Sequence, residues 1–147
     1  MPDARPDPPS GDEPPDDPSR PTGSPYAEFS PPDRLETVGR LSGLVAAVQA
    51  ELCSVVAACA ADGDGSLDGA TGMEAWLMGA CGLSRVHARE LVRVATALVD
   101  LPAIAAAFAS GTVSWDLVRP ATRFATPETD EQIARDLPGW SVAQVER

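Results

Sequence analysis

Three arginines recur at a spacing of four residues in the segment LSRVHARELVRVATALVD, namely Arg85, Arg89 and Arg93. On an α-helix this spacing drifts by only about 40° per step, so the three guanidinium groups would follow one face. Ser84 precedes them and is a preferred helix cap, which predicts that a helix begins at this point. A basic face on such a helix is typical of contacts to DNA phosphates. We therefore predict that the three arginines bind nucleic acid.

The net charge of the chain opposes strong nucleic-acid binding. The 147 residues include 22 acidic and 11 basic side chains, and the formal net charge is −11. Because DNA affinity depends mainly on phosphate neutralisation, we expect any DNA binding to be weak. The alternative for the arginine face is an ordinary solvated surface, since Glu90 lies beside it and surface ion pairs contribute little stability.

The residue types that bind zinc are few in this chain and poorly spaced. Cys53 and Cys59 are six residues apart on a predicted helix, which separates their directions by about 120° and prevents shared coordination. An odd number of cysteines, with Cys81 as the third, suits reduced thiols packed as small hydrophobic residues in a cytoplasmic protein. We expect His87, the one histidine, to lie on the apolar side of its helix as a core or capping residue.

The segment DGDGSLDGATG places Asp62, Asp64 and Asp68 at a spacing that resembles a calcium-binding loop. Such a loop requires glycine at its sixth position and glutamate at its twelfth, where this chain has Leu67 and Met73. We predict a polar turn between helices instead. No nucleophile has a base at a recognisable spacing and no glycine-rich loop follows a strand, so we predict no catalytic residue, no metal and no cofactor.

A long helix is predicted to begin at Asp33, with Glu36 completing a capping box, and to end near Ala61. Its apolar residues recur at steps of four and three, as in a coiled-coil seam. The seam consists of Leu41, Val45, Val48, Leu52, Val55 and Cys59. Such a seam needs a partner helix, either within the domain or in a second copy, so we expect that the Leu41–Cys59 seam can form a homo-oligomer.

This helix is also the only candidate membrane span in the sequence. Gln49 and Glu51 lie near the centre of Leu41–Ala61, and a carboxylate there costs about 2.5–3.5 kcal/mol on insertion. Alanine and serine cannot offset that cost. We therefore predict a soluble amphipathic helix and no membrane partner.

Residues 1–32 have a composition that opposes folding. Eleven of the 15 prolines of the chain precede Asp33, in a segment rich in aspartate, serine and glycine. Such a segment cannot bury enough apolar surface to offset its ordering entropy. We predict a disordered tail over residues 1–32 and a helical domain over residues 33–147.

Short helices are predicted after the long one, and the absence of period-two alternation makes the fold class all-α. The predicted boundaries are a capping box at Thr71–Glu74, an end at Gly82, a cap at Ser84, a break at Leu101–Pro102, an end at Gly111, a cap at Ser114, a cap at Thr126 and a start at Trp140–Ser141. The residues expected to face the core are Trp76, Ala88, Leu91, Ala95, Leu98 and Val99. The close succession of helices over Leu83–Arg119 predicts a helix-turn-helix-like unit.

The segment Arg34–Arg147 resembles the actinobacterial domain of unknown function 222, also called the 13E12 repeat family. The similarity rests on the runs DGSLDGATGMEAWLMGACGLS, ARELVRVATALVDLPAIAAAFASGTVSWDLVR and ATPETDEQIARDLPGWSVAQVER. The resemblance implies a helical domain that usually precedes an HNH endonuclease domain. The chain has one histidine and no asparagine, so the HNH motif is absent, and the resemblance implies a domain truncated at its C-terminal end. Leu83–Arg119 is also similar to the helix-turn-helix region of ParB-type partition proteins.

The leading hypothesis is a non-catalytic accessory domain of an HNH-endonuclease-type protein, for partner or nucleic-acid positioning. Its expected partners are DNA, bound weakly, and a separate nuclease half. One alternative is a free-standing DNA-binding or regulatory module of the helix-turn-helix kind. The other is a decayed repeat fragment without activity.

Overall fold

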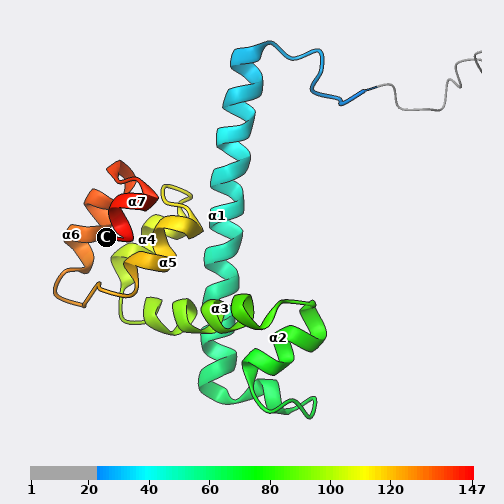
Figure 1. The fold of residues 1–147 in the computed structure, drawn as a ribbon, viewed down its shortest axis with the longest axis vertical. Helices are drawn as coiled ribbons and strands as arrows, with labels where there is room; N and C mark the ends of the chain where they lie inside the picture. Colours follow the sequence, from blue (N-terminus) through cyan, green and yellow to red (C-terminus); the bar gives the residue numbers. More distant parts are fainter. Residues whose placement is uncertain (1–22) are drawn as a thin grey trace, which may run out of the picture.

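The computed structural model describes residues 23–147, and within them every regular element is a helix (Figure 1). The all-α fold class is therefore confirmed for the described part of the chain. The elements are α1 (Pro31–Asp62), η1 (Asp64–Ser66), α2 (Met73–Cys81), α3 (Arg85–Leu98), α4 (Pro102–Ala109), α5 (Trp115–Ala121), α6 (Asp130–Asp136), η2 (Leu137–Gly139) and α7 (Val142–Val145). The prediction of a disordered tail falls mostly on residues 1–22, which lie outside the described residues.

The cap of the long helix α1 lies three residues earlier than predicted, at Ser30 and not at Asp33. The Ser30 hydroxyl accepts a hydrogen bond from the Asp33 backbone N–H at 3.3 Å and donates one to the Asp33 carboxylate at 2.6 Å. Pro31 and Pro32 fit the first turn, where a backbone N–H has no partner within the helix. The predicted tail, residues 1–32, is therefore two residues too long, because Pro31 and Pro32 form the start of α1.

In Figure 1, α2 lies to one side of α1 and α4 to α7 lie to the other, with α3 running across α1 between them. α3 crosses the C-terminal half of α1, α4 contacts α1 beside it, α6 packs on α4, and α7 packs on α5. The N-terminal end of α1 extends beyond the other helices. The largest fully buried side chains are Phe108, Leu77, Ile104, Leu137, Val56, Val94, Val113, Val118 and Cys53.

Most predicted helix boundaries are close to those of the structure, and two further predicted caps are wrong. α2 begins after Gly72 with no side-chain cap, so Thr71 does not cap it. α6 begins at Asp130 and not at Pro127, because a turn intervenes in which the Thr129 N–H donates to the Thr126 carbonyl at 3.0 Å. The predicted start at Trp140–Ser141 is confirmed by the Ser141 capping box of α7.

The N-terminus of α4 is capped by a residue from a distant part of the chain. The Asp130 carboxylate accepts hydrogen bonds from the backbone N–H groups of Ala103 at 2.7 Å and Ile104 at 2.9 Å. Leu101, which precedes the helix, offers no capping oxygen of its own. Asp130 is buried, and these bonds fasten α6 to α4.

The predicted coiled-coil seam of α1 does not face the domain core. The face that packs inward carries Ala46, Cys53 and Val56, which are nearly fully buried. The seam residues from Leu41 to Val55 are exposed instead. Small side chains let the other helices approach α1 closely. The prediction followed the spacing of the large residues and therefore chose the wrong face of α1.

By length and composition alone, α1 could cross a membrane. An 18-residue window within it has a mean hydropathy of 1.9, and 17% of that window is buried in the domain. α3 and α4 satisfy the same criterion only as a pair, and this pair is bent by 118°. α3 lies across α1 and carries three arginines, which a bilayer around α1 would have to accommodate. The expectation of no membrane partner stays a prediction.

Candidate nucleic-acid interface

α2, a three-residue turn and α3 form a unit with the connectivity of a helix-turn-helix motif. Gly82 ends α2 in the left-handed conformation, with φ of 65°, and its backbone N–H donates to the Leu77 carbonyl. Ser84 caps α3 as predicted, since its hydroxyl accepts a hydrogen bond from the His87 N–H at 3.2 Å. The buried side chains of Leu77 and Ala88 belong to the core that holds the two helices together. A short glycine-containing turn of this kind positions the second helix of such a motif.

The apolar face of α3 is buried largely as the sequence predicts. Ala88, Leu91, Ala95 and Leu98 all lie in the core. Val99 does not, because α3 ends at Leu98 and the side chain of Val99 is 68% exposed. The exposed residues of the N-terminal half of α3 include Arg85, Val86 and Arg89.

His87 lies outside the core, which contradicts the predicted core or capping role of its side chain. The residue is exposed, and its imidazole stacks on the Trp115 indole with ring centroids 6.2 Å apart and an angle of 25° between planes. Trp115 in turn contacts Phe108, with centroids 6.4 Å apart. The first turn of α5 thus supplies a surface partner that helix periodicity within α3 does not indicate.

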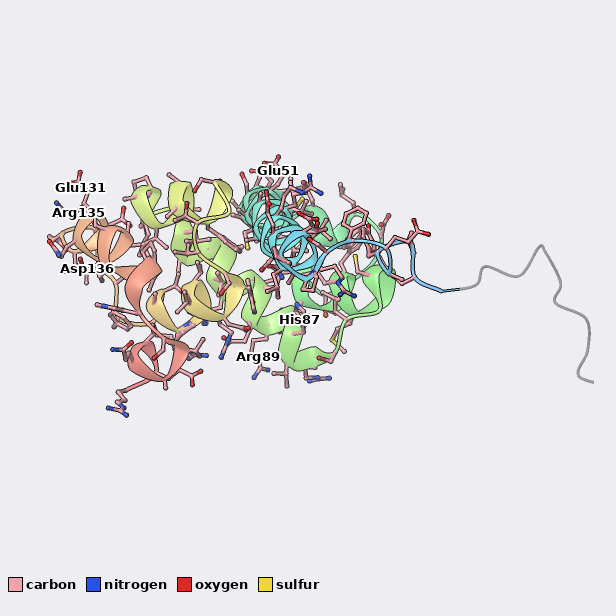
Figure 2. All side chains as sticks on the ribbon, turned by 90° about the horizontal axis from the view of Figure 1, so that it is seen from above. Glu51, His87, Arg89, Glu131, Arg135 and Asp136 are labelled. Carbon is pink, nitrogen blue, oxygen red and sulfur yellow. The ribbon has the colours of Figure 1, made fainter. Side chains whose placement is uncertain are left out.

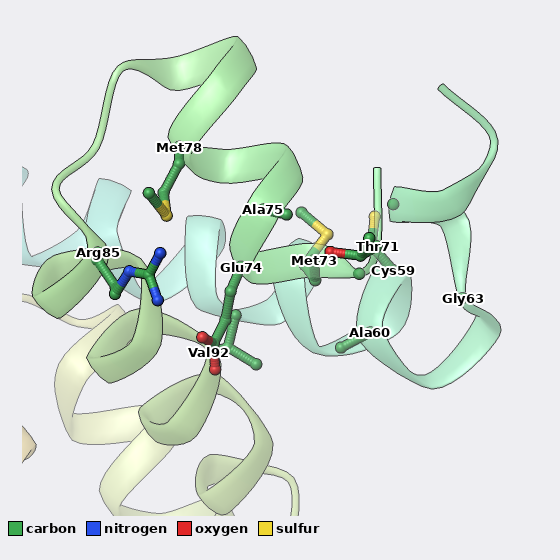
Figure 3. Close-up of a pocket in the computed structure, with 12 residues that line it drawn as sticks. Cys59, Ala60, Gly63, Thr71, Met73, Glu74, Ala75, Met78, Arg85 and Val92 are labelled. Carbon is green, nitrogen blue, oxygen red and sulfur yellow. The ribbon is translucent and has the colours of Figure 1, made fainter. Parts of the chain in front are cut away.

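Arg85 and Arg89 lie on the exposed surface of α3, each near the same carboxylate. Arg85 borders a cleft of about 510 Å³ between α1, α2 and α3, and Figure 3 shows its guanidinium group directed over the cleft toward Glu74, with Met78 alongside. The Arg89 Nε lies 3.8 Å from the Glu74 carboxylate. Both partners of this ion pair are well exposed, so it holds Arg89 only weakly. In Figure 2, Arg89 and His87 lie on the opposite side of the molecule from Glu51.

Arg93, the third predicted residue, is bound within the protein. Its guanidinium group donates two hydrogen bonds to Glu90 at 3.2 Å, one to the Thr122 hydroxyl at 3.2 Å and one to the Arg119 carbonyl at 2.8 Å. Arg123 donates to both Glu90 oxygens at 2.8 Å. This network ties α3 to the end of α5, so Arg93 supports the fold whether or not it also contacts a ligand.

Comparison with known families identifies the family of this chain. A family model described as "Domain of unknown function (DUF222)" matches residues 35–145. The chain belongs to this family. No curated protein and no solved structure matches it. The resemblance stated from the sequence is thus confirmed over most of the helical region, and the match by itself assigns no activity to a DUF222 chain.

The thiols of this DUF222 chain differ in their accessibility. Cys53 lies on the face of α1 that packs into the core, and burial raises the pKa of its thiol to about 11. Cys81 is exposed, and Cys59 is half-buried at the cleft. Among residues 23–147, no three histidine, cysteine, aspartate or glutamate side chains lie together as a metal site would require.

Glu90 is the charged centre of the network between α3 and α5. The hydrogen bonds from Arg93, followed by those from Arg123, hold the pKa of the Glu90 carboxyl below its ordinary value. The sequence indicated that Glu90 lies beside the arginine face, but it did not indicate that Glu90 binds Arg93 and Arg123 together. Glu90 and Arg123 are 33 positions apart in the sequence, so helical periodicity could not predict their contact.

We expect Glu90→Gln to destabilise the domain by about 1–3 kcal/mol at neutral pH, because it weakens charge-assisted hydrogen bonds. Since the pKa of Glu90 is lowered in the folded state, its stabilisation is complete above the unfolded pKa and is lost as the pH falls through the folded pKa. The difference between wild type and variant should therefore shrink on acidification. Thermal melts across acidic pH test this, and Glu74→Gln, which alters an exposed pair, is the control. A difference that stays constant with pH contradicts the prediction.

Proposed function

We propose that this chain is a non-catalytic accessory domain of an HNH-endonuclease-type protein and that it positions nucleic acid through the N-terminal half of α3. The observation that carries the proposal is the exposure of this half-helix directly after a helix-turn-helix-like turn. Arg85 and Arg89 are exposed there, and the side chain of Val86 between them is 75% exposed. In helix-turn-helix proteins, the second helix enters the major groove with its N-terminal residues toward the bases.

The electrostatics of the first turn of α3 favour an anion. The turn contains no acidic residue, and the backbone N–H groups at a helix N-terminus carry partial positive charge. Arg85 adds a full charge at the same end. Phosphate oxygens would therefore meet the helix end and the arginine together.

Two features limit the strength of this interaction. Glu74 lies near both exposed arginines, and the whole chain carries a formal net charge of −11. Because affinity for a duplex depends on neutralising phosphates, we expect a dissociation constant no tighter than about micromolar at physiological salt. Weak binding suits a domain that orients a substrate for another protein unit.

The accessory role rests on the family resemblance and on residue chemistry. An HNH site needs several histidines and an asparagine, and this chain has one histidine and no asparagine. The nuclease site would therefore be supplied by another polypeptide segment. A neighbouring coding sequence that encodes His-Asn-His residues would support the accessory role over a free-standing DNA-binding module.

We predict that Arg85→Ala/Arg89→Ala reduces the salt dependence of DNA binding by about two units in log K against log salt, because each lost phosphate contact removes about 0.9 units. Fluorescence anisotropy of a labelled duplex across a salt series measures this slope. Arg93 stays unchanged in this variant because its removal would disturb the fold.

The matched control is Arg40→Ala/Arg135→Ala, which removes the same charge from exposed positions on α1 and α6. Its slope should equal that of wild type within error. Equal slopes for all three proteins would show that α3 does not contact the duplex. A complete lack of binding by wild type at low salt would eliminate the nucleic-acid function.

A further inference from the structure

An apolar stripe runs along the solvent side of α1. We name it the α1 stripe, and it consists of Val38, Leu41, Val45, Val48, Leu52 and Val55. Every member is at least 44% exposed, although each is a valine or leucine. The stripe is about 25 Å long at 1.5 Å per residue. Single exposed valines and leucines are normal on a protein surface, whereas six in one continuous row form an apolar patch.

The charge pattern of α1 shows that the stripe is not an ordinary solvated face. Between Leu41 and Ala61 the only charged residue is Glu51. A solvated helix face usually carries charged side chains every few residues. The remaining charges of the helix gather near its two ends, with Asp33, Arg34, Glu36 and Arg40 near its start and Asp62 at its end.

We propose that the α1 stripe is the interface of an antiparallel dimer formed by two copies of this chain. The stripe is complementary to itself in that orientation, because its residues alternate at steps of three and four as in a coiled coil. The register that pairs all six residues joins Val38 with Val55, Leu41 with Leu52, and Val45 with Val48 of the second copy, each pair occurring twice. The interface is isologous, as in most homodimers.

The antiparallel orientation follows from charge and shape. It brings Arg34 of each copy near Asp62 of the other, whereas a parallel pair places like charges together. α3 crosses the C-terminal half of α1, the turn after α4 reaches Gly43 near its middle, and its N-terminal end extends beyond the other helices (Figure 1). An antiparallel pair puts the two helical bodies at opposite ends, while a parallel pair puts them side by side. The stripe stops before Cys59, where η1 lies against α1.

Other occupants fit the stripe less well. Residues 1–22 of this chain contain Met1 as their only large apolar residue, so they cannot supply a matching apolar face. A lipid bilayer would match the hydropathy of α1, but α3 with its arginines crosses the same helix. A second copy matches the stripe in length, spacing and end charges at once.

Sedimentation equilibrium of the full chain across a concentration series tests the dimer. Wild type should show a monomer–dimer equilibrium, and Val48→Glu should weaken it by about a hundredfold or more, because the two-fold axis places the unpaired carboxylate in the interface twice. The matched control is Val99→Glu, directly after α3, since the two valines are almost equally exposed at 69% and 68%. Circular dichroism should show the same helical content for all three proteins.

Disulfide trapping tests the register. In a Cys59→Ser/Cys81→Ser background, Val38→Cys/Val55→Cys should form a covalent dimer on mild oxidation, and neither single variant should, because only the antiparallel pair brings residues 38 and 55 together. Covalent dimers of the single Val38→Cys variant would indicate a parallel pair and overturn the proposed orientation.

Three results would overturn the dimer itself. The first is a monomer at every concentration, and the second is a dimer that Val48→Glu leaves unchanged. The third is a monomer that floats with vesicles of phosphatidylcholine and phosphatidylglycerol and no longer does so as Val48→Glu. That result would assign the stripe to a lipid surface. None of these measurements depends on DNA binding by α3.

Discussion

Replacing Gly111 with alanine is expected to lower the free energy of unfolding by about 2–5 kcal/mol. Gly111 has a φ of 77°, and leaving the ordinary backbone region costs a residue with a side chain about 1–2 kcal/mol. A Cβ at this position would also lie 2.5 Å from the Gly43 carbonyl oxygen of α1. Because that contact is with backbone, α1 would have to move, and such overpacking typically costs about 1–3 kcal/mol. Urea denaturation measures the loss.

Two further glycine variants separate these contributions. Gly82→Ala meets no atom within 4 Å at a φ of 65°, so it should show the backbone cost alone. Gly43→Ala would place its Cβ at an ordinary 3.5 Å from the Gly111 carbonyl oxygen within a helix, so it should cost nothing and gain up to about 1 kcal/mol of helix propensity. Equal losses for Gly111→Ala and Gly82→Ala would contradict the close approach of α1 to the turn after α4.

Replacing Asp130 with alanine is expected to cost about 2–4 kcal/mol, because it removes the charged cap of α4 and leaves backbone N–H groups without a partner. One of the two bonds, to the Ile104 N–H, is itself buried. The midpoint of urea unfolding should fall without a large change in its slope. Asp130→Asn keeps one acceptor oxygen and should lose less.

Glu131→Ala is the matched control for Asp130→Ala, since it removes a neighbouring acidic residue that is exposed on α6 (Figure 2). Its effect should stay within about 0.5 kcal/mol of zero. A loss equal to that of Asp130→Ala would show that the general negative charge near α4 matters and that the two specific hydrogen bonds do not.

The sequence alone determined the features whose causes are local. The all-α class, the Ser84 cap, the end of α2 at Gly82 and the buried face of α3 depend on residues within a few positions of one another. Hydrogen bonds between a cap and its helix, and apolar residues at helical spacing, act over one or two turns. The family followed from the same local runs.

Errors at helix starts arose where two local signals competed. Ser30 and Asp33 both suit a cap, and the two prolines between them favour the earlier start in the structure. At Thr126, the following Pro127 fits a turn as well as a first helical turn, and the turn forms. Local preference ranks such alternatives only weakly, because they differ by about 1 kcal/mol or less.

Tertiary structure decided which helix faces are buried and which charged side chains are bound by other groups of the protein. The seam of α1 has the stronger periodicity, yet the small residues Ala46 and Cys53 face the domain, because close approach of helices favours small side chains. Arg93 shares a helix face with two exposed arginines and is bound by groups 26 and 29 residues away. Such partners meet only after chain folding brings distant helices together. Helical spacing therefore predicts which residues share a face, and the packing of the whole domain determines what that face contacts.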